Sequence, residues 1–193
     1  RTSQKTNKLY RVAYQLAHTS TSTYINQHTI NERGKLMKEI GSKIDTDFMI
    51  KTVKDGQENE QLFSSLLDRR AIVSVYMKNN TGSCDKQTAS LAKHASWFAD
   101  KGYQLMALSK DTCGSHKKYA DKQGISFTLL SDPDHAFANA TQSMVEKKMY
   151  GKVYEAPSRS AFVIDTDGTI LAVIEKVNTK AHAEELKELV ESL

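Results

Sequence analysis

The stretch from Ser74 to His94, SVYMKNNTGSCDKQTASLAKH, places a cysteine between two different patterns of apolar residues. Before it, the run AIVSVY at residues 71–76 is rich in β-branched side chains and is bounded by charged residues, which predicts a buried strand. After it, apolar residues recur at spacings of three and four, which predicts a helix with one buried face. Cys84 is therefore expected in the first turn of a helix that follows a strand.

The predicted helix runs from Cys84 to Asp100 and ends at Gly102. The chain then alternates further strand and helix patterns, and it closes with two strands joined at Asp167-Gly168 and an amphipathic helix. This order predicts an α/β fold with a central mixed β-sheet flanked by helices. A thioredoxin-like fold has this order of elements, with Cys84 at the start of its principal helix.

The basic excess of the chain lies in its N-terminal segment. The 193 residues carry a net charge of +4; residues 1–31 hold four basic residues and no acidic one, and the remainder holds 23 of each. We expect residues 1–40 to form a basic N-terminal extension and residues 41–193 to form the folded domain. The extension fits a solvated arm, a segment packed on the body or part of a transit peptide. Nucleic-acid binding is disfavoured, because four charges without a clustered stripe are a weak electrostatic footprint.

Composition excludes several other classes of protein. No run approaches 18 consecutive apolar residues, so we expect no membrane span. Two cysteines, Cys84 and Cys113, are too few for the disulfide framework of a secreted domain. We therefore expect a cytoplasmic protein, with organellar or nuclear targeting by the extension as the open alternative.

The chemistry of Cys84 depends on its ionisation, because the thiolate is the nucleophile. The unpaired N–H groups and the dipole of a first helical turn stabilise an anion there. Lys78 and Lys86 add positive charge nearby, whereas the carboxylate of Asp85 opposes the thiolate. Thr81 is placed to hydrogen-bond the sulfur or a bound oxygen. On this pattern alone, a nucleophile and a small buried structural residue are equal alternatives.

The segment YMKNNTGSCDKQ resembles the peroxidatic loop of peroxiredoxins, whose pattern is Pro-x-x-x-Thr-x-x-Cys. Three more segments resemble the bacterioferritin-comigratory-protein, or peroxiredoxin Q, branch in order and spacing: LSKDTCGSHKKYADKQGI, FTLLSDPDHAFANA and KKMYGKVYEAPSRSAFVIDTDGTI. The resemblance covers roughly residues 41–193. It implies the peroxiredoxin variant of the thioredoxin-like fold and a thiol-dependent peroxidase that needs no cofactor.

Within this resemblance, Cys84 corresponds to the peroxidatic cysteine, Thr81 to the hydroxyl that orients the peroxide and Arg159 to the guanidinium that stabilises the thiolate. Gln87 falls where the family often has Glu or Gln, and we expect it to hold the loop. The implied reaction is in-line attack of the thiolate on the O–O bond, which yields Cys-sulfenic acid and water or an alcohol. The implied substrates are hydrogen peroxide and small organic hydroperoxides, and the implied reductant is thioredoxin or a similar dithiol.

The loop departs from the family pattern at three positions. Met77 stands in place of the motif proline, and Gly82 and Ser83 stand in place of Pro-Gly. Glycine in place of proline leaves the unfolded loop more flexible, at a cost of about 0.4–1 kcal/mol. These departures predict a looser and slower pocket. The alternative is a catalytically weakened domain that acts as a redox-sensing or binding module.

Cys113 is the candidate resolving cysteine, although it does not occupy the usual resolving positions, where this chain has Ala89 and Ala120. It is expected at the start of the next helix, 29 residues after Cys84. A disulfide between the two helix starts then requires local unwinding. A one-cysteine cycle with an outside thiol and a merely structural Cys113 are the alternatives.

A zinc site formed by Cys84, Cys113, His94 and His116 is disfavoured. Cys113 and His116 have ligand-like spacing, but Cys84 and His94 do not form a matching pair. We therefore expect no metal. The resemblance also implies a monomer, because this branch is often monomeric, with a dimer formed through the extension as the alternative.

Overall fold

The computed structural model describes residues 11–12, 37–149 and 151–193. The strands of these residues, in chain order, are β1 (Arg11–Val12), β2 (Met49–Lys54), β3 (Gln57–Leu62), β4 (Ala71–Val75), β5 (Gln104–Ser109), β6 (Thr128–Ser131), β7 (Met144–Met149), β8 (Lys152–Pro157), β9 (Ala161–Ile164) and β10 (Ile170–Ile174). The helices are the 3-10 helix η1 (Phe63–Leu66), α1 (Gly82–Ala92), α2 (Ala95–Asp100), α3 (Cys113–Gln123), α4 (Ala136–Ala140) and α5 (His182–Glu191).

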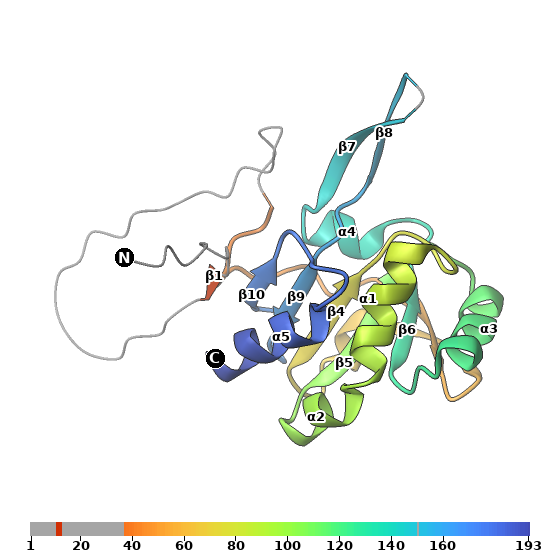
Figure 1. Ribbon diagram of the computed structural model, residues 1–193. Helices are drawn as coiled ribbons and strands as arrows, with labels where there is room; N and C mark the ends of the chain where they lie inside the picture. The colour runs from red at the N-terminus through yellow and green to blue at the C-terminus, as the bar shows by residue number, and fades with distance from the viewer. Residues whose placement is uncertain (1–10, 13–36, 150) are drawn as a thin grey trace, which may run out of the picture.

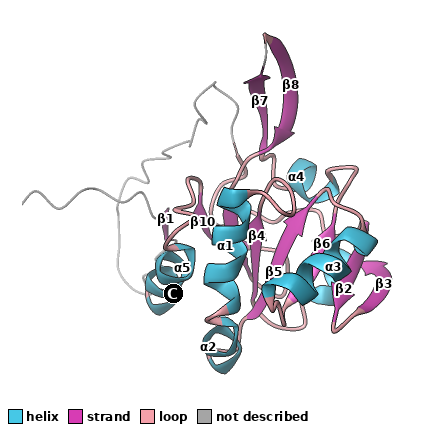
Figure 2. Cartoon of the chain, turned by 45° about the vertical axis from the view of Figure 1, so that its right-hand side comes forward, coloured by secondary structure: helices cyan, strands magenta, loops and turns pink. Residues whose placement is uncertain are grey.

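The centre of the molecule is a mixed sheet with strand order β1-β10-β9-β4-β5-β6-β2-β3. Strands β4, β5 and β6 run parallel, and the other paired strands of the sheet run antiparallel. Helices lie on both sides of this sheet, and β7 and β8 form a separate hairpin that stands out from the body (Figures 1 and 2). The predicted α/β class with a central mixed sheet is confirmed.

Strand β4 lies in the middle of the sheet and is buried on both faces, which explains its unbroken apolar run. Successive side chains of a strand point to opposite faces. Ile72 packs into the core cluster under α1, α2, α3 and α5, whereas Val73 and Val75 pack into the cluster under η1 and α4. The carboxyl end of this rigid strand leads directly into the loop that carries Cys84.

The prediction of one continuous helix from Cys84 to Asp100 is wrong. The chain breaks between α1 and α2, where His94 leaves the helical conformation with φ −124° and ψ 12°. The apolar spacing continues across the break because α1 and α2 bury their faces in the same core cluster, so spacing alone does not reveal it. Gly102, with φ +81°, ends α2 as predicted.

Two Asp-Gly turns shape the edges of the sheet. Asp55 and Gly56 join β2 to β3 with φ angles of +49° and +73°, as a two-residue hairpin loop requires. Gly168 lies between β9 and β10 with φ +84°, and a Cβ atom there would lie 3.0 Å from the side chain of Thr46. The turn predicted at Asp167-Gly168 is confirmed, and its glycine is required by both backbone angle and space.

The β7–β8 hairpin is an element that the sequence pattern does not predict. Its strands pair from Met144 opposite Pro157 to Met149 opposite Lys152. Most of its side chains are exposed, so its strands lack the apolar runs of the central sheet. The hairpin follows α4 directly, and its base lies beside that helix (Figures 1 and 2).

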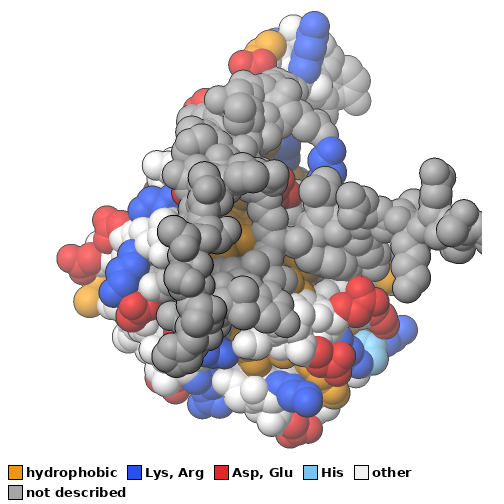
Figure 3. All heavy atoms as spheres, turned by 90° about the vertical axis from the view of Figure 1, so that its left-hand side faces the viewer, with side chains coloured by type: hydrophobic (Ala, Val, Ile, Leu, Met, Phe, Trp, Pro, Cys, Tyr) orange, Lys and Arg blue, Asp and Glu red, His pale blue; other side chains and the backbone are white. Residues whose placement is uncertain are grey.

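Most of the predicted N-terminal extension lies outside the described residues. Within the described part, β1 pairs with β10 at the edge of the sheet, and Met37 is buried in the core. The boundary at residue 40 stays a prediction, as do the roles considered for the extension. On the face in Figure 3, the described surface intersperses Lys and Arg with Asp and Glu. Among the helices of the described residues, none has the length and hydropathy that a membrane crossing needs.

Candidate active site

The loop between β4 and α1 brings Cys84 into the first turn of α1, as predicted. Thr81 precedes the helix with extended backbone angles, φ −124° and ψ 134°, and its carbonyl accepts a hydrogen bond from the N–H of Asp85 at 2.8 Å. The N–H groups of this first turn have no partners within the helix, so they favour a negative charge beside them. The Cys84 side chain is nevertheless buried, with only 1% of its surface exposed.

Residues of α3 and the segment before it hold the Cys84 loop in place. The backbone N–H of Asn79 donates to Asp111 Oδ2 at 2.9 Å, and its side-chain amide donates to Ser115 Oγ at 2.9 Å. The hydroxyl of Tyr76 donates to Asn79 Oδ1 at 2.7 Å. These buried and half-buried bonds supply rigidity that the loop does not obtain from the family's prolines.

Hydrogen-bond donors surround the sulfur of Cys84. Burial raises the pKa of the Cys84 thiol, but the Thr81 side chain, the backbone of Lys78, the Arg159 guanidinium and the backbone of Met77 lower it and prevail. The guanidinium Nη2 of Arg159 lies 3.3 Å from Cys84 Sγ. Cys84 therefore ionises at a lower pH than an ordinary thiol, which makes it the more reactive nucleophile at neutral pH.

Arg159 reaches the site from the segment before β9, 75 residues away from Cys84 in the sequence. Its Nη1 donates to Gln87 Oε1, and its Nη2 also donates to Ser83 Oγ at 3.2 Å. Ser83 and Gln87 lie one turn apart on α1, so the guanidinium spans the start of the helix beside the sulfur. The structure thus brings together these four residues, all of which the sequence analysis singled out.

A chain of buried polar side chains leads from Gln87 into α5. Gln87 Nε2 donates to Ser74 Oγ at 2.9 Å, and Ser74 Oγ lies 2.9 Å from His182 Nε2. The other ring nitrogen of His182, Nδ1, lies 3.8 Å from Glu185 Oε2. Burial lowers the pKa of His182, so its ring is neutral near pH 7. The chain orients Gln87 and, through it, Arg159. Sequence spacing gives no signal for Ser74 or His182.

Met77 occupies the position of the motif proline and is contacted by a residue that the sequence analysis did not identify. Lys147 of β7 places its Nζ 2.9 Å from Met77 Sδ and donates to the carbonyl of Pro157 at 3.0 Å. Burial lowers the pKa of Lys147, Arg159 lowers it further, and Cys84 raises it. Lys147 therefore lies within the electrostatic field of both groups. Its only sequence signal is its place in a segment that resembles the family.

Gly82 and Ser83 replace the family's Pro-Gly at the start of α1. Gly82 is exposed, and a Cβ atom built on it would meet no atom within 4 Å. No feature of the described residues therefore requires glycine at position 82. Ser83, in contrast, has acquired a contact, because its hydroxyl accepts from Arg159.

Cys113 begins α3 and is also buried, but its neighbours differ from those of Cys84. Burial raises the pKa of the Cys113 thiol, Glu58 raises it further, and a hydrogen bond with Ser131 opposes them. Glu58 belongs to β3 and Ser131 to β6, which lie on the side of the sheet away from β9. Both cysteines are free. The structure does not place Cys113 beside Arg159, and its role as the resolving cysteine stays a prediction.

The residues of the zinc alternative are not gathered in one place. His94 contacts Lys187 and lies 3.5 Å from Glu184, both on α5. His116 instead lies 3.3 Å from the hydroxyl of Tyr76, beneath the Cys84 loop. Across the described ranges, no group of three or more His, Cys, Asp or Glu residues could hold a metal ion.

A thioredoxin-like sheet that presents an activated cysteine to a fixed guanidinium defines the class of thiol peroxidases. The family comparison agrees, because the AhpC/TSA family matches residues 41–173 of this sequence. The chain belongs to the AhpC/TSA family and is a peroxiredoxin of the bacterioferritin-comigratory-protein type. It is accordingly a thiol-dependent peroxidase, an oxidoreductase that consumes a peroxide and a thiol reductant.

Individual relatives confirm the predicted branch and fold. A putative peroxiredoxin of Mycobacterium tuberculosis H37Rv is 32% identical over 136 residues, which cover 70% of this chain and 87% of that protein. Peroxiredoxin Bcp of Escherichia coli K12 is 31% identical over 127 residues, which cover 65% of this chain and 81% of that protein. The solved structure of Xanthomonas campestris peroxiredoxin Q matches 79% of this chain and 97% of its own with a TM-score of 0.72 at 22% identity, which shows the shared fold.

Proposed function

We propose that this chain reduces hydrogen peroxide and small organic hydroperoxides through Cys84 and that thioredoxin or a similar dithiol regenerates it. The observation that carries the proposal is the 3.3 Å contact between Arg159 and the sulfur of Cys84, whose pKa is lowered. A relative supports the substrate class, because Xanthomonas campestris bacterioferritin comigratory protein is described as having alkyl peroxide reduction activity. Two free cysteines suit a reducing compartment, so we also propose a cytoplasmic enzyme, and a monomer.

The reaction begins when the thiolate of Cys84 attacks the terminal oxygen of the hydroperoxide. The S–O bond forms as the O–O bond breaks, so the sulfur is oxidised to a sulfenic acid and the peroxide leaves as an alkoxide or hydroxide that takes up a proton. Arg159, held by Gln87 and Ser83, lies where negative charge grows in the transition state. The Thr81 hydroxyl donates to the carbonyl oxygen of Lys78 at 2.8 Å, and we propose that its oxygen accepts a hydrogen bond from the bound peroxide and so orients it.

We propose Cys113 as the residue that resolves the sulfenic acid. Its sulfur attacks the sulfenic sulfur, a disulfide forms and water leaves; the dithiol reductant then cleaves the disulfide by exchange. Disulfide geometry requires Cα atoms within about 7 Å. Because both cysteines are buried at the starts of separate helices, we expect the start of α1 or α3 to unwind before the bond forms.

The intact mass of the reduced protein after one equivalent of hydrogen peroxide tests these steps, with Cys84→Ser and Cys113→Ser as matched variants. We expect the parent to lose two hydrogens and neither variant to do so. A gain of oxygen on Cys84 in the parent would establish a one-cysteine cycle and refute resolution by Cys113. If no rapid change occurs, the proposed substrate chemistry is wrong and the redox-sensing or binding alternative takes its place.

A further inference from the structure

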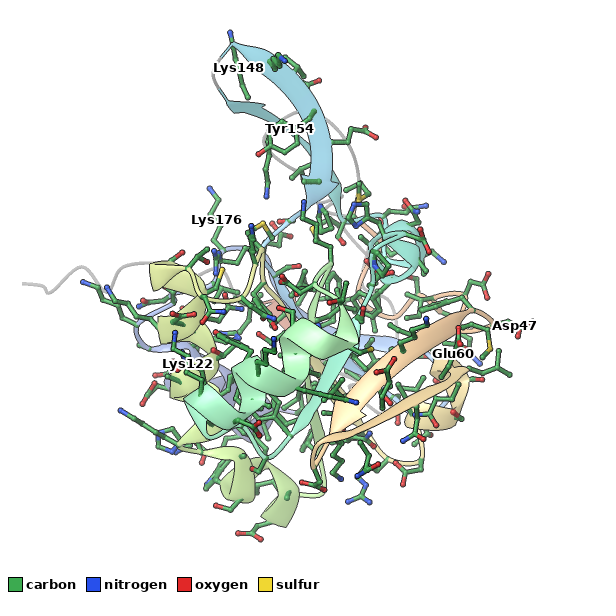
Figure 4. The ribbon with its side chains drawn as sticks, turned by 90° about the vertical axis from the view of Figure 1, so that its right-hand side faces the viewer. Asp47, Glu60, Lys122, Lys148, Tyr154 and Lys176 are labelled. Atoms are coloured by element: carbon green, nitrogen blue, oxygen red, sulfur yellow. The ribbon has the colours of Figure 1, made fainter. Side chains whose placement is uncertain are left out.

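Lys147 lies close enough to Cys84 and Arg159 for both groups to shift its pKa. It lies on β7, within the hairpin that projects from the body, yet its side chain is half-buried while that of the next residue, Lys148, is exposed. Figure 4 shows Lys148 near the outer end of the hairpin, away from the sheet. Two adjacent lysines of one strand therefore occupy opposite environments, because successive side chains of a strand point to opposite faces.

Two contacts hold the ammonium group of Lys147 beside the loop that carries Cys84. The group lies 2.9 Å from Met77 Sδ and 3.0 Å from the carbonyl oxygen of Pro157. Met77 belongs to the loop between β4 and α1 that carries Cys84, where it stands in place of the family's motif proline. An ammonium group has three N–H donors, so these two contacts leave one donor for a bound molecule.

The thioether of Met77 is a weak acceptor, which leaves the ammonium group incompletely stabilised. Burial and the neighbouring charge of Arg159 both lower the pKa of Lys147, which makes the ammonium group a stronger acid than an exposed lysine. Arg159 has no such capacity, because a guanidinium is not deprotonated in proteins. The pocket thus contains one cation that can only donate hydrogen bonds and a second that can also release a proton.

We propose that Lys147 is a catalytic residue of the peroxide pocket, which stabilises the leaving oxygen and protonates it when Cys84 cleaves the hydroperoxide. The inference rests on the proposed function of Cys84. The thiolate forms a bond to the terminal oxygen, the O–O bond breaks, and the leaving oxygen takes its proton from the ammonium group. The products are Cys84 sulfenic acid, an alcohol or water, and a neutral amine on Lys147, which regains its proton from solvent.

The choice of oxidant tests this role. An alkoxide leaving group is strongly basic and needs a proton, whereas the carboxylate that leaves peracetic acid is weakly basic and does not. For Lys147→Met we expect the rate constant with tert-butyl hydroperoxide to fall about 100-fold, the lower end of the range for a positioned acid. With peracetic acid we expect a fall of less than about threefold, because little proton transfer accompanies that step.

Lys148→Met is the matched control, since it removes a lysine from the same strand outside the pocket, and we expect it to leave both rate constants unchanged. Alkylation of Cys84 by iodoacetamide gives a second control, because this reaction cleaves no O–O bond. If Lys147→Met fails to fold, Lys147→Gln replaces it with the same expectation.

Three outcomes distinguish failure of the Lys147 proposal from failure of the proposed function. Equal loss with both oxidants, or equal loss of alkylation, would show that Lys147 only shapes the pocket and would refute the proposal. No loss in Lys147→Met would also refute it. If the parent protein itself reacts with neither oxidant faster than a free thiol does, the proposed function fails first, and that result is distinct from the other two.

Discussion

Cys84 and Cys113 occupy equivalent places in the fold, yet the pKa values of their thiols are shifted in opposite directions. Each follows a parallel strand of the central sheet and lies in the first turn of the next helix. Each is almost fully buried, with 1% and 5% of the side chain exposed. The pKa of Cys84 is nevertheless lowered and that of Cys113 raised.

The difference comes from the partners that other elements bring. Cys84 receives a hydrogen bond from Arg159, and Arg159, Thr81 and the backbone of Lys78 all lower its pKa, which favours the thiolate. Cys113 faces Glu58 of β3, whose negative charge favours the neutral thiol. Because burial raises the pKa at both sites, and each lies at a helix start, neither feature by itself makes a reactive cysteine. The comparison shows that the donors gathered from distant segments decide which thiol is the nucleophile.

Removal of Arg159 should reduce the difference in reactivity between the two cysteines. We expect Arg159→Gln to raise the pKa of Cys84 and to lower its rate with hydrogen peroxide by roughly 10²–10³-fold, as the loss of one transition-state donor does. Stopped-flow rates and the pH dependence of alkylation measure both effects. Arg70→Gln, which removes an arginine paired with Asp165 at 3.7 Å, is the control. An unchanged Cys84 pKa in Arg159→Gln would show that Thr81 and the backbone groups of the loop activate the thiol without Arg159.

The buried chain behind Cys84 predicts sensitivity to acid. The folded-state pKa of His182 is lowered, so the unfolded chain binds its proton first, and the free energy of unfolding falls as pH drops below about 6.5. Each such histidine contributes up to about 1.4 kcal/mol per pH unit. In urea titrations at pH 7.5 and 5.5 we expect His182→Gln to lose less stability between the two pH values than the parent does. An equal loss in both proteins would contradict this assignment, and His94→Gln, nearer the surface, serves as control.

Changing the charge beside Cys113 should make it more like Cys84. We expect Glu58→Gln to lower the pKa of Cys113 and to increase its alkylation rate at neutral pH by no more than about fivefold, because a surface charge acts weakly through solvent. Glu60→Gln, two residues along β3 on the same face, is the matched control (Figure 4). If Cys113 were alkylated at equal rates in Glu58→Gln and Glu60→Gln, burial alone would account for its raised pKa.

The smallest expected effect concerns the entry to α1. Gly82 lies at the first helical position, its N–H is not needed by the helix, and Thr81 already has the extended backbone that precedes proline. We expect Gly82→Pro to raise the free energy of unfolding by about 0.4–1 kcal/mol. A loss of stability in Gly82→Pro would show that the loop before α1 does not have the backbone geometry that the family's proline requires.

Local patterns in the sequence predicted much of the fold. The apolar run of β4, the helix start at Cys84 and the turn at Asp167-Gly168 depend on neighbours in the sequence, and all three are confirmed. The same patterns missed the break before α2, because both helices face one core cluster. They also missed the β7–β8 hairpin, whose exposed strands leave no apolar period to detect.

The sequence by itself determined the order of strands and helices, the position of Cys84 at a helix start and, through its motifs, the peroxiredoxin family. These features depend on short-range residue spacing and on segments that resemble the family. The tertiary structure alone decided which groups surround Cys84: Arg159 reaches its sulfur and Lys147 reaches the thioether of Met77 in the same loop, each across at least 70 residues of sequence, through the strand order of the sheet and the hairpin before β9. Periodicity records which face of an element is buried but not which element covers it, so the opposite behaviour of the two cysteines emerges only when the chain is folded.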